Sequence, residues 1–387
     1  MKKNLTAVLL TAVIVLSLFS FTGCTNGNSQ PAQGENNPGG QQAAEKAEIP
    51  TINVCWGHEL HTGNMQLNSI KPELFSGNST YLKPISDSQY ELVKDGKTIA
   101  YINHVLTKGA SESMTLMSQG HLDVAYCSST AVMTAYDTGV DVSVLGPIQS
   151  GGVSIVASVN APYNTFEELV EYAKKSDKPI VGGYHSAISS PRIVLEYALK
   201  EAGLTVTEDT ADYSADVVLM DLKGISNLIP SMSSGQVELW AGPVPNPQNA
   251  EAQNIGKIIA TLDELPGGKW IDFPCCTMNV TTALKEKHPE IVQSLVQVAA
   301  DVSNFAQNNR QETAELMSGF IGLEPEVLIK NDTTYTTKVT EHFTNGMAIY
   351  YDAMSKMGKF SDRLKDKSID EVMSSVFDFS YTENISN

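Results

Sequence analysis

Two stretches of the chain share the same order of apolar and polar positions. Residues 117–130 read MSQGHLDVAYCSST, and residues 232–244 read MSSGQVELWAGPV. Each predicts the end of a helix, a glycine in the left-handed conformation (Gly120 or Gly235), a short strand, and a loop of small or polar residues. Such a loop lies at the carboxyl end of a strand, where open α/β sheets usually bind ligands. We therefore expect two similar lobes whose strand ends face one cleft, although helix, turn and strand in this order also recur by chance in α/β proteins.

The rest of the chain continues this alternation of strands and helices. Residues 51–56 form a β-rich run that ends in a polar loop, and Lys94-Asp95-Gly96-Lys97 between two alternating runs predicts a hairpin. Residues 153–159 alternate with the period of a strand. Further strands are expected at 179–181 and 217–220, and helices at 165–175, 190–203, 289–308, 312–320, 338–357 and 368–376.

This pattern predicts an α/β fold of two lobes joined by two crossings. Residues 50–159 and 273–387 would form lobe 1, including a helical C-terminal extension, and residues 160–272 would form lobe 2. A chain of 387 residues is long enough to bury a large core in such an arrangement. Two crossings between lobes would make a hinge.

The amino terminus predicts a targeting segment. In residues 1–23, Lys2 and Lys3 precede an apolar run that is too short to span a bilayer comfortably, which is typical of a signal peptide. Phe21-Thr22-Gly23-Cys24 is similar to the lipobox of bacterial lipoproteins, whose cysteine is acylated, except for phenylalanine where leucine is usual. Residues 24–48 contain little to bury and would form a disordered tether. We therefore expect a lipid anchor at Cys24 and a location at the outer face of the cytoplasmic membrane.

The net charge limits the partners. The chain has 44 acidic and 26 basic residues and a formal charge of −18. Binding to phosphate backbones requires a basic surface, so nucleic acid is excluded as a partner. The hydrophobic content of 42% is that of an ordinary soluble globular protein.

No known catalytic motif occurs in the sequence. There is no Gly-x-Ser-x-Gly elbow, phosphate loop or dinucleotide fingerprint. The histidines of His58-Glu59-Leu60-His61 are one residue closer together than in the His-Glu-x-x-His metalloprotease motif. We therefore expect neither catalysis nor a cofactor.

Soft metal ligands nevertheless recur along the predicted first lobe. Cys55, His58 and His61 lie within seven residues, and the remaining cysteines fall at or near predicted strand ends: Cys127, Cys275 and Cys276. Buried cysteines often serve only as small hydrophobic residues, and we expect these to be free and packed. Because the spacings match no standard zinc pattern, we predict no metal and keep a metal-binding or metal-chelate-binding protein as an alternative.

The predicted helix starts favour an anionic ligand. The hydroxyls and amides of residues 128–130 and of Ser189 and Ser190 mark helix amino ends, which carry unpaired donors and a partial positive charge. Arg192, in the first turn of its helix, could clamp two oxygens of an oxyanion. The other interpretation is that the serines are only caps and that Arg192 pairs with Glu196.

Several of these features follow one another in a specific order. The lipobox and tether precede residues 120–125 (GHLDVA), then Ser128-Ser129-Thr130, and then residues 182–186 (GGYHS) before a helix that ends in residues 200–204 (KEAGL). This order resembles the solute-binding lipoproteins of ABC importers. Over residues 51–323 it is most similar to the nitrate, sulfonate and taurine group, which includes binders of thiamine-pyrimidine precursors.

The resemblance implies a type II periplasmic-binding fold without catalysis. It implies a monomer that passes its ligand to a membrane permease powered by a separate ATPase. The expected ligand is a small organic anion, whose apolar part would be covered by aromatic side chains; a heteroaromatic ligand held by stacking and by acceptors such as Glu59 is the competing possibility. The residues expected to line the cleft are Trp56, Gly57, His58, Ser128, Ser129, Thr130, Tyr184, His185, Ser186, Ser190, Arg192, Trp240 and Gly242.

Overall fold

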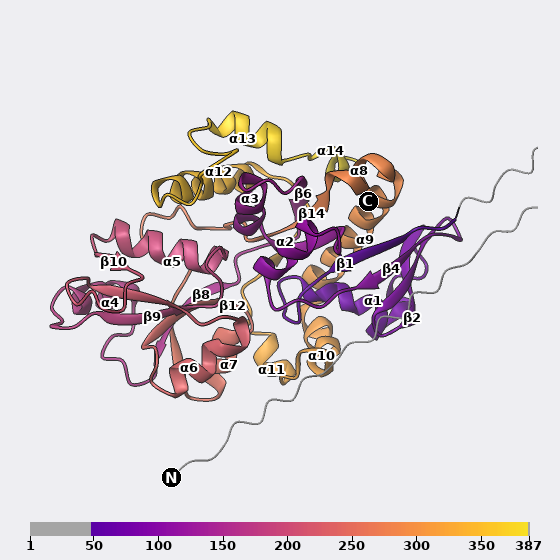
Figure 1. Ribbon diagram of the computed structural model, residues 1–387. Helices are drawn as coiled ribbons and strands as arrows, with labels where there is room; N and C mark the ends of the chain where they lie inside the picture. The colour runs from indigo at the N-terminus through magenta and orange to yellow at the C-terminus, as the bar shows by residue number, and fades with distance from the viewer. Residues whose placement is uncertain (1–47, 386–387) are drawn as a thin grey trace, which may run out of the picture. The chain divides into compact units, whose positions relative to one another are not determined.

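Two β-sheets organise residues 48–385, the part of the chain that the computed structural model describes (Figure 1). The first sheet has seven strands in the order β2-β3-β4-β1-β5-β14-β6, and the second has six in the order β10-β11-β9-β12-β8-β13. The first consists of β1 (Thr51–Cys55), β2 (Thr80–Ser86), β3 (Gln89–Lys94), β4 (Lys97–His104), β5 (Val124–Ser128), β6 (Val142–Pro147) and β14 (Cys276–Thr281). The second consists of β8 (Val153–Ser158), β9 (Ile180–Tyr184), β10 (Val206–Thr207), β11 (Val217–Asp221), β12 (Leu239–Pro243) and β13 (Gly256–Thr261). The predicted signal peptide, Cys24 and nearly all of the tether lie outside the described residues.

The two similar stretches of the sequence occupy different sheets. Strand β5 of the first stretch pairs with β1 and β14, whereas β12 of the second stretch pairs with β8 and β9. Gly120 and Gly235, which precede these strands, have φ values of 72° and 75°. Both glycines therefore adopt the left-handed conformation that the sequence predicts.

The chain crosses between the sheets at two neighbouring segments. Gly151 and Gly152, with φ values of 67° and 70°, lead from the short strand β7 (Gln149–Ser150) into β8. The return crossing lies beside the first, because the amide of Gly151 donates to the carbonyl of Phe273 at 2.9 Å. A third segment, β15 (Thr334–Tyr335), pairs with β7. Because β8 pairs with β12 and β13, the change of sheet comes before Val153 and not at the predicted boundary of residue 159.

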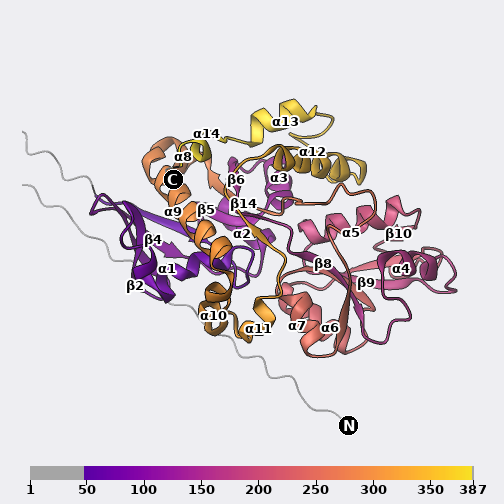
Figure 2. The same cartoon turned by 180° about the vertical axis from the view of Figure 1, so that it is seen from behind.

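Helices cover both sheets. They are α1 (Leu67–Ile70), α2 (Ala110–Ser118), α3 (Ser129–Asp137), α4 (Phe166–Ala173), α5 (Ser190–Glu201), α6 (Leu228–Ser233), α7 (Asn246–Ala252), α8 (Thr282–Lys287), α9 (Pro289–Asn308), α10 (Arg310–Ile321), α11 (Pro325–Leu328), α12 (Glu341–Lys356), α13 (Ile369–Val376) and α14 (Ser380–Glu383). Short 3-10 helices lie at η1 (Gly63–Gln66), η2 (Pro72–Leu74) and η3 (Ile225–Asn227). Figure 2 shows α8, α9 and α10 following one another along the first-sheet side of the molecule. Among residues 48–385, no helix is both long and apolar enough to cross a membrane.

Local sequence signals explain several of these elements. Asp95 and Gly96 both have positive φ, at 49° and 74°, as a two-residue hairpin turn between β3 and β4 requires. The Thr165 hydroxyl caps α4 by accepting the amide of Glu168 at 3.2 Å, and the Glu168 carboxylate accepts from the amide of Asn164. Helix α5 begins at Ser190, as predicted, with Ser189 at its N-cap position.

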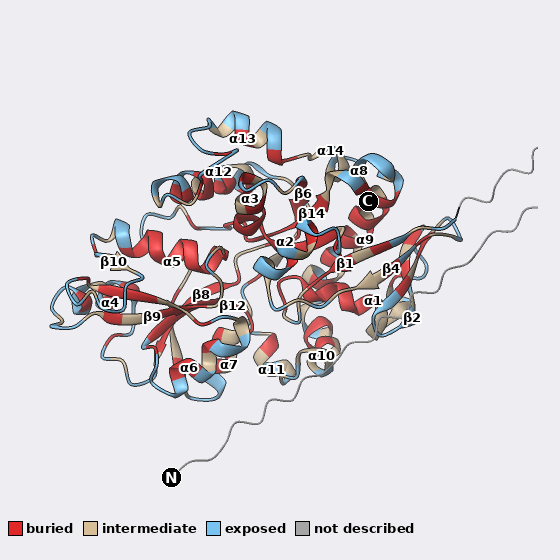
Figure 3. Ribbon diagram, in the orientation of Figure 1, coloured by how far each residue is buried: buried red, intermediate tan, exposed pale blue. Residues whose placement is uncertain are grey.

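The C-terminal helices contact elements of both sheets. Helix α12 packs against α5, whereas α13 and α14 pack beside β6. The buried carboxylate of Asp137, at the end of α3, accepts the backbone amides of Ser361, Asp362 and Leu364 and so fixes the segment between α12 and α13. Figure 3 shows buried residues in the strands of both sheets and along α3 and α5. One hydrophobic core therefore runs through both sheets, with a smaller cluster around Trp240.

Candidate functional site

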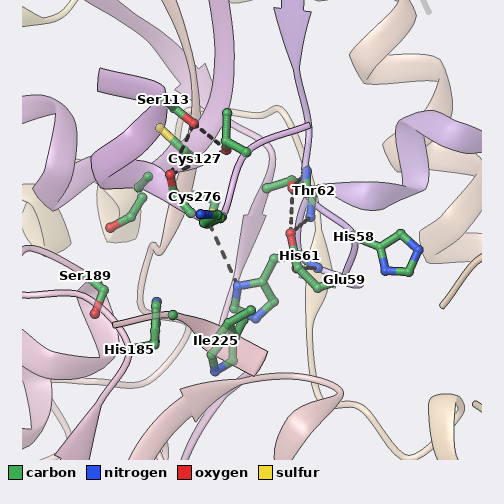
Figure 4. A pocket seen from close by; sticks show the side chains of 18 of the residues that line it. His58, Glu59, His61, Thr62, Ser113, Cys127, His185, Ser189, Ile225 and Cys276 are labelled. Atoms are coloured by element: carbon green, nitrogen blue, oxygen red, sulfur yellow. Dashed lines mark hydrogen bonds between the residues drawn. The ribbon is translucent and has the colours of Figure 1, made fainter. Parts of the chain in front are cut away.

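A cavity of about 210 Å³ lies where strand ends of both sheets meet. The first sheet contributes residues that follow β1 and β4, the end of β5 and the start of β14, and the second contributes residues that follow β9, β11 and β12 (Figure 4). The wall consists of Cys55, Gly57, His58, Glu59, His61, Thr62, Thr107, Lys108, Gly109, Ala110, Ser113, Tyr126, Cys127, Ser128, His185, Ser189, Pro191, Lys223, Gly224, Ile225, Ser226, Pro243, Cys275 and Cys276. The carboxyl ends of strands are the usual ligand position in open α/β sheets.

Four of the expected ligand-binding residues lie in this wall. They are Gly57, His58, Ser128 and His185. His58 is exposed, and its ring packs against Phe320 at a centroid distance of 4.3 Å. The Nδ1 atom of His185 is buried and has no hydrogen-bond partner among the described residues. Their role in binding stays a prediction.

The three expected aromatic residues do not line the cavity. Trp56 is fully buried, stacks on His104 at 3.9 Å between ring centroids, and donates its indole N–H to Gln66. Trp240 points into the small core cluster of the second sheet, because side chains alternate between the two faces of a strand. The Tyr184 hydroxyl donates to Glu208 at 3.2 Å. In this conformation these three aromatic side chains therefore cannot cover a ligand in the cavity.

Arg192 is also held away from the cavity. Its side chain is 1% exposed and forms ion pairs with Glu196, at 2.9 Å, and with Glu208. It also donates to the carbonyl of Ala187 at 3.2 Å, and its guanidinium lies 4.7 Å from the centre of the Tyr184 ring. The interpretation as a helix-face ion pair with Glu196 holds, and the oxyanion clamp does not.

The expected hydroxyls are mostly bonded to one another. The Ser128 hydroxyl lies 2.7 Å from those of both Thr130 and Ser190 and accepts the amide of Ser190 at 3.1 Å. The hydroxyl of Thr130 donates to the carbonyl of Ile188, and Ser129 donates to the carbonyl of Cys275. The contacts of Ser128, Thr130 and Ser190 join the start of α3 to the start of α5, and that of Ser129 joins α3 to the residue before β14. Ser129, Thr130 and Ser190 therefore hold elements together and do not line the cavity.

Two other expected residues also lie outside the wall. The Ser186 hydroxyl lies 2.6 Å from that of Ser111, which joins the loop after β9 to α2. A side chain at Gly242 would meet Leu228 and Trp240, so this position faces the core.

Three buried donor atoms meet at the wall of the cavity. Nδ1 of His61 lies 3.7 Å from Sγ of Cys275 and 3.8 Å from Sγ of Cys276, and the two sulfurs are 3.7 Å apart. The other ring nitrogen of His61, Nε2, lies 2.6 Å from the carbonyl of Gly152 in the first crossing. The adjacent cysteines follow the second crossing. The cluster therefore lies where the chain passes between the sheets.

The two thiols and the imidazole of this cluster strongly shift one another's pKa values. Hydrogen bonding from Cys276, together with the nearby His61, lowers the pKa of Cys275 well below its usual value in spite of burial. Burial alone would lower the pKa of His61, but the charge and hydrogen bond of Cys275, the charge of Glu59 and the Gly152 carbonyl together outweigh it, and the pKa rises to about 9. Hydrogen bonding to Cys275 and burial raise the pKa of Cys276. Cys275 and His61 therefore each shift the pKa of the other in the direction that favours its charged form.

His185 is kept neutral near the same cluster. Burial, helped by the charge of His61, lowers the pKa of His185 to about 4. A neutral imidazole with an unpartnered ring nitrogen can act as an acceptor or as a metal ligand.

The other two cysteines line the cavity with partners of their own. Cys55 contacts the hydroxyls of Thr107, at 3.4 Å, and Ser113, at 3.6 Å. Cys127 accepts from the side-chain amide of Asn279 at 3.5 Å. Burial raises the pKa of both thiols. All four described cysteines are buried and free, and only Cys275 and Cys276 join the cluster with His61.

Part of the wall escaped the sequence analysis. Residues 107–110 (TKGA) precede α2, and residues 223–226 (KGIS) follow β11. Each segment contains a lysine, and Gly109 and Gly224 have φ values of 145° and 143°. The signal used for β5 and β12 was a glycine between a helix end and a short strand, whereas Gly109 and Gly224 follow strands β4 and β11.

The chain belongs to the NMT1-like family, whose model matches residues 89–320. An uncharacterised protein of Methanocaldococcus jannaschii is 29% identical over 140 residues, which are 35% of this chain and 85% of that protein.

Solved structures show the same fold at low sequence identity. A ligand-binding component of an ABC-type import system from Staphylococcus aureus, with zinc bound, matches with a TM-score of 0.65 at 15% identity, covering 87% of this chain and 99% of that one. The nitrate-binding protein NrtA of Synechocystis PCC 6803 matches with a TM-score of 0.64 at 10% identity, covering 87% and 88%. The alkanesulfonate-binding protein SsuA of Xanthomonas axonopodis pv. citri, bound to MOPS, matches with a TM-score of 0.59 at 12% identity, covering 81% and 94%. These likenesses confirm the periplasmic-binding-protein fold.

Proposed function

We propose that the chain is the extracytoplasmic solute-binding component of an ABC importer and that the cavity between the two sheets holds its ligand. The observation that carries this proposal is the composition of the wall, to which strand ends of both sheets contribute. The first sheet with residues 273–387 and the second sheet would act as two lobes that open about the crossings at Gly151-Gly152 and Phe273-Pro274. Opening would release the ligand to a permease that a separate ATPase drives.

The ligand we propose is a small organic anion of the sulfonate class. Two cationic side chains, Lys108 and Lys223, belong to the wall, and the amino end of α2 begins beside Lys108 at Gly109 and Ala110. Lys223 pairs with Asp221 at 2.7 Å, whereas Lys108 has no ion pair among the described residues. We therefore assign the binding of the anionic group to Lys108 and the amino end of α2, in place of Arg192.

A heteroaromatic ligand has less support. Trp56, Tyr184 and Trp240 do not line the cavity, so none offers a stacking surface. The Glu59 carboxylate already accepts from the amides of His61 and Thr62 and from the Thr62 hydroxyl, which leaves it a poor acceptor for a ligand. We propose no catalysis at this site.

A thermal-shift screen followed by calorimetry tests the ligand class. The panel is alkanesulfonates, taurine, nitrate, carboxylates and pyrimidines. A ligand that binds only the folded state adds about 2.7 kcal/mol of stability at a hundredfold excess over its dissociation constant. We expect a sulfonate to stabilise the protein and Lys108→Ala to weaken its binding, with Lys175→Ala, at an exposed position just after α4, as the matched control. Stabilisation by pyrimidines alone would overturn the anion proposal.

We also propose the lipid anchor at Cys24, removal of residues 1–23, and a monomer held at the outer face of the cytoplasmic membrane. Mass spectrometry of the mature amino terminus tests this location. An amino terminus at acylated Cys24 is the expected result, and an intact segment of residues 1–23 would refute it.

A further inference from the structure

Beyond an organic ligand, we propose that the cavity wall contains a binding site for one borderline-soft divalent metal ion, such as Zn²⁺, made by His61, Cys275 and Cys276. Two thiolates and one imidazole are a donor set that zinc prefers. All three side chains line the cavity, so a fourth coordination position would open toward the solute. The inference rests on the proposed function only for the identity of that solute.

The spacing of the three donor atoms fits a tetrahedral ion. Zinc bonds of about 2.3 Å to sulfur and 2.0 Å to nitrogen give edges of roughly 3.8 Å between two sulfurs and roughly 3.5 Å between sulfur and nitrogen. The observed separations are 3.7 Å between the sulfurs and 3.7 and 3.8 Å from Nδ1 to the sulfurs. An ion could therefore bind with side-chain shifts of only a few tenths of an ångström.

The orientation of His61 supports the same site. Histidine ligands usually donate their second ring N–H to a carbonyl or carboxylate, which fixes the ring and directs the free nitrogen at the metal. Nε2 of His61 has this contact with the carbonyl of Gly152, and Nδ1 faces the two sulfurs. A side chain at Gly152 would overlap the His61 ring, so the glycine allows this close approach.

Charge and burial also fit a bound cation. The exposed fractions of His61, Cys275 and Cys276 are 4%, 2% and 7%. Two thiolates neutralise a divalent ion, which makes its burial acceptable. His185, with its unpartnered Nδ1, lies in the same cavity wall but outside this group of three donor atoms.

The cluster is distinct from the other cysteines of the cavity. Cys127 and Cys55 also line it, but their sulfurs contact Asn279 and the hydroxyls of Thr107 and Ser113 and do not join the three donor atoms. They supply matched controls, because a Cys→Ser change at either position removes a cavity thiol without removing a proposed ligand.

Co²⁺ and Zn²⁺ binding to the purified, reduced protein tests the site. We expect one ion per chain and, with Co²⁺, the thiolate charge-transfer band and the d–d bands of tetrahedral coordination. Cys275→Ser, Cys276→Ser and His61→Ala should each weaken binding by at least about a hundredfold, since even residues that only orient a ligand are worth about 10–100-fold. Cys127→Ser and Cys55→Ser should leave the affinity within about twofold. Circular dichroism and thermal melts check that each variant is folded.

Three outcomes separate this inference from the proposed function. No stoichiometric metal, or metal binding that Cys55→Ser or Cys127→Ser abolishes, overturns the site, and sulfonate binding by the same metal-free protein then leaves the proposed function intact. Metal binding that depends on the cluster, with no response to any organic anion, supports the site and refutes the anion. A sulfonate that changes the d–d bands of the Co²⁺ protein supports both.

Discussion

The hydroxyl oxygens of Ser128 and Ser190 lie 2.7 Å apart, although Ser128 ends β5 of the first sheet and Ser190 begins α5, which follows β9 of the second sheet. Both side chains are buried, and the amide of Ser190 also donates to Ser128. If the sheets belong to two lobes that separate, this contact must break on opening. It therefore contributes to the stability of the closed conformation described here.

We predict that the two serines are energetically coupled. A hydrogen bond of this kind contributes about 0.5–1.5 kcal/mol, and an unpaired buried hydroxyl costs about 1–3 kcal/mol. In a double-mutant cycle, Ser128→Ala and Ser190→Ala together should cost less than the sum of the single changes. Urea unfolding of the four proteins measures this, and strictly additive costs would contradict the coupling.

A second contact, between α2 and the loop after β9, can be converted into a covalent link. The hydroxyls of Ser111 and Ser186 lie 2.6 Å apart, and both residues are accessible at the surface. We expect the Ser111→Cys, Ser186→Cys double variant to form a disulfide on mild oxidation, raise the melting temperature and slow ligand release. Each single variant is the control, because it supplies one new thiol without a partner. Failure to cross-link would show that α2 and the loop after β9 are not neighbours in solution.

The fold was largely predictable from the sequence, because its signals are local. The glycines that end helices, the Asp95-Gly96 turn and the amphipathic pattern of residues 289–308 each specify their own element, and α9 spans that range as predicted. The sheet to which each strand belongs was harder to predict from the sequence. The alternating pattern of β8 predicts a strand but does not tell which strands pair with its edges.

The site was predicted in part for the same reason. Loops at strand ends are recognisable, so Gly57, His58, Ser128 and His185 were predicted at a position where the structure has a cavity wall. Side-chain direction depends on packing that the sequence does not display: Trp240 turns into a core cluster, and Arg192 is captured by two glutamates. The meeting of His61 with Cys275 and Cys276 requires the return crossing, which brings residues more than two hundred positions apart into contact.

Arg192 should matter for stability and not for ligand affinity. Arg192→Met removes one of the two cationic partners of the buried Glu196, which keeps Lys200 at 2.8 Å, so the cost should stay below the roughly 3–5 kcal/mol of a fully broken buried pair. We expect a clear loss in the free energy of unfolding, while the dissociation constant of any ligand found in the screen stays within about threefold. Glu208→Gln, which removes the more exposed partner, should cost much less. A selective loss of affinity would return Arg192 to the ligand site.

A side chain at Gly152 should destabilise the folded protein. Its φ of 70° disfavours other residues, and a Cβ atom there would overlap the His61 ring and the Thr333 hydroxyl. We expect Gly152→Ala to destabilise the protein by about 1–3 kcal/mol. Gly96→Ala is the control for positive φ alone, because no atom lies near its added Cβ. Equal losses at the two positions would show that the contact with His61 adds nothing.

The ion pair between Asp378 and Lys285 predicts a pH-dependent contribution to stability. Lys285 Nζ lies 3.0 Å from Asp378 Oδ2, and the Asp378 amide donates to the carbonyl of Val144, so the pair helps to attach the C-terminal segment to β6. Burial alone would raise the pKa of Asp378, but the Ser380 hydroxyl and the Lys285 ammonium outweigh it and lower the pKa below the usual value.

A carboxylate whose pKa is lowered by folding stabilises the folded state above its unfolded pKa, which is about 3.9. That contribution disappears as the pH falls through the lower pKa of the folded state. At pH 7, Asp378→Asn should therefore reduce the free energy of unfolding by up to about 1 kcal/mol, the usual range for a partly exposed pair. The difference from the unmodified protein should shrink steadily as the pH falls below about 4.

Asp352→Asn, which removes an exposed pair with Lys356 at 2.8 Å, is the matched control and should change stability less at every pH. A cost for Asp378→Asn that stays constant down to the acid limit would mean that the neutral side chain, through its contact with Ser380, makes the whole contribution.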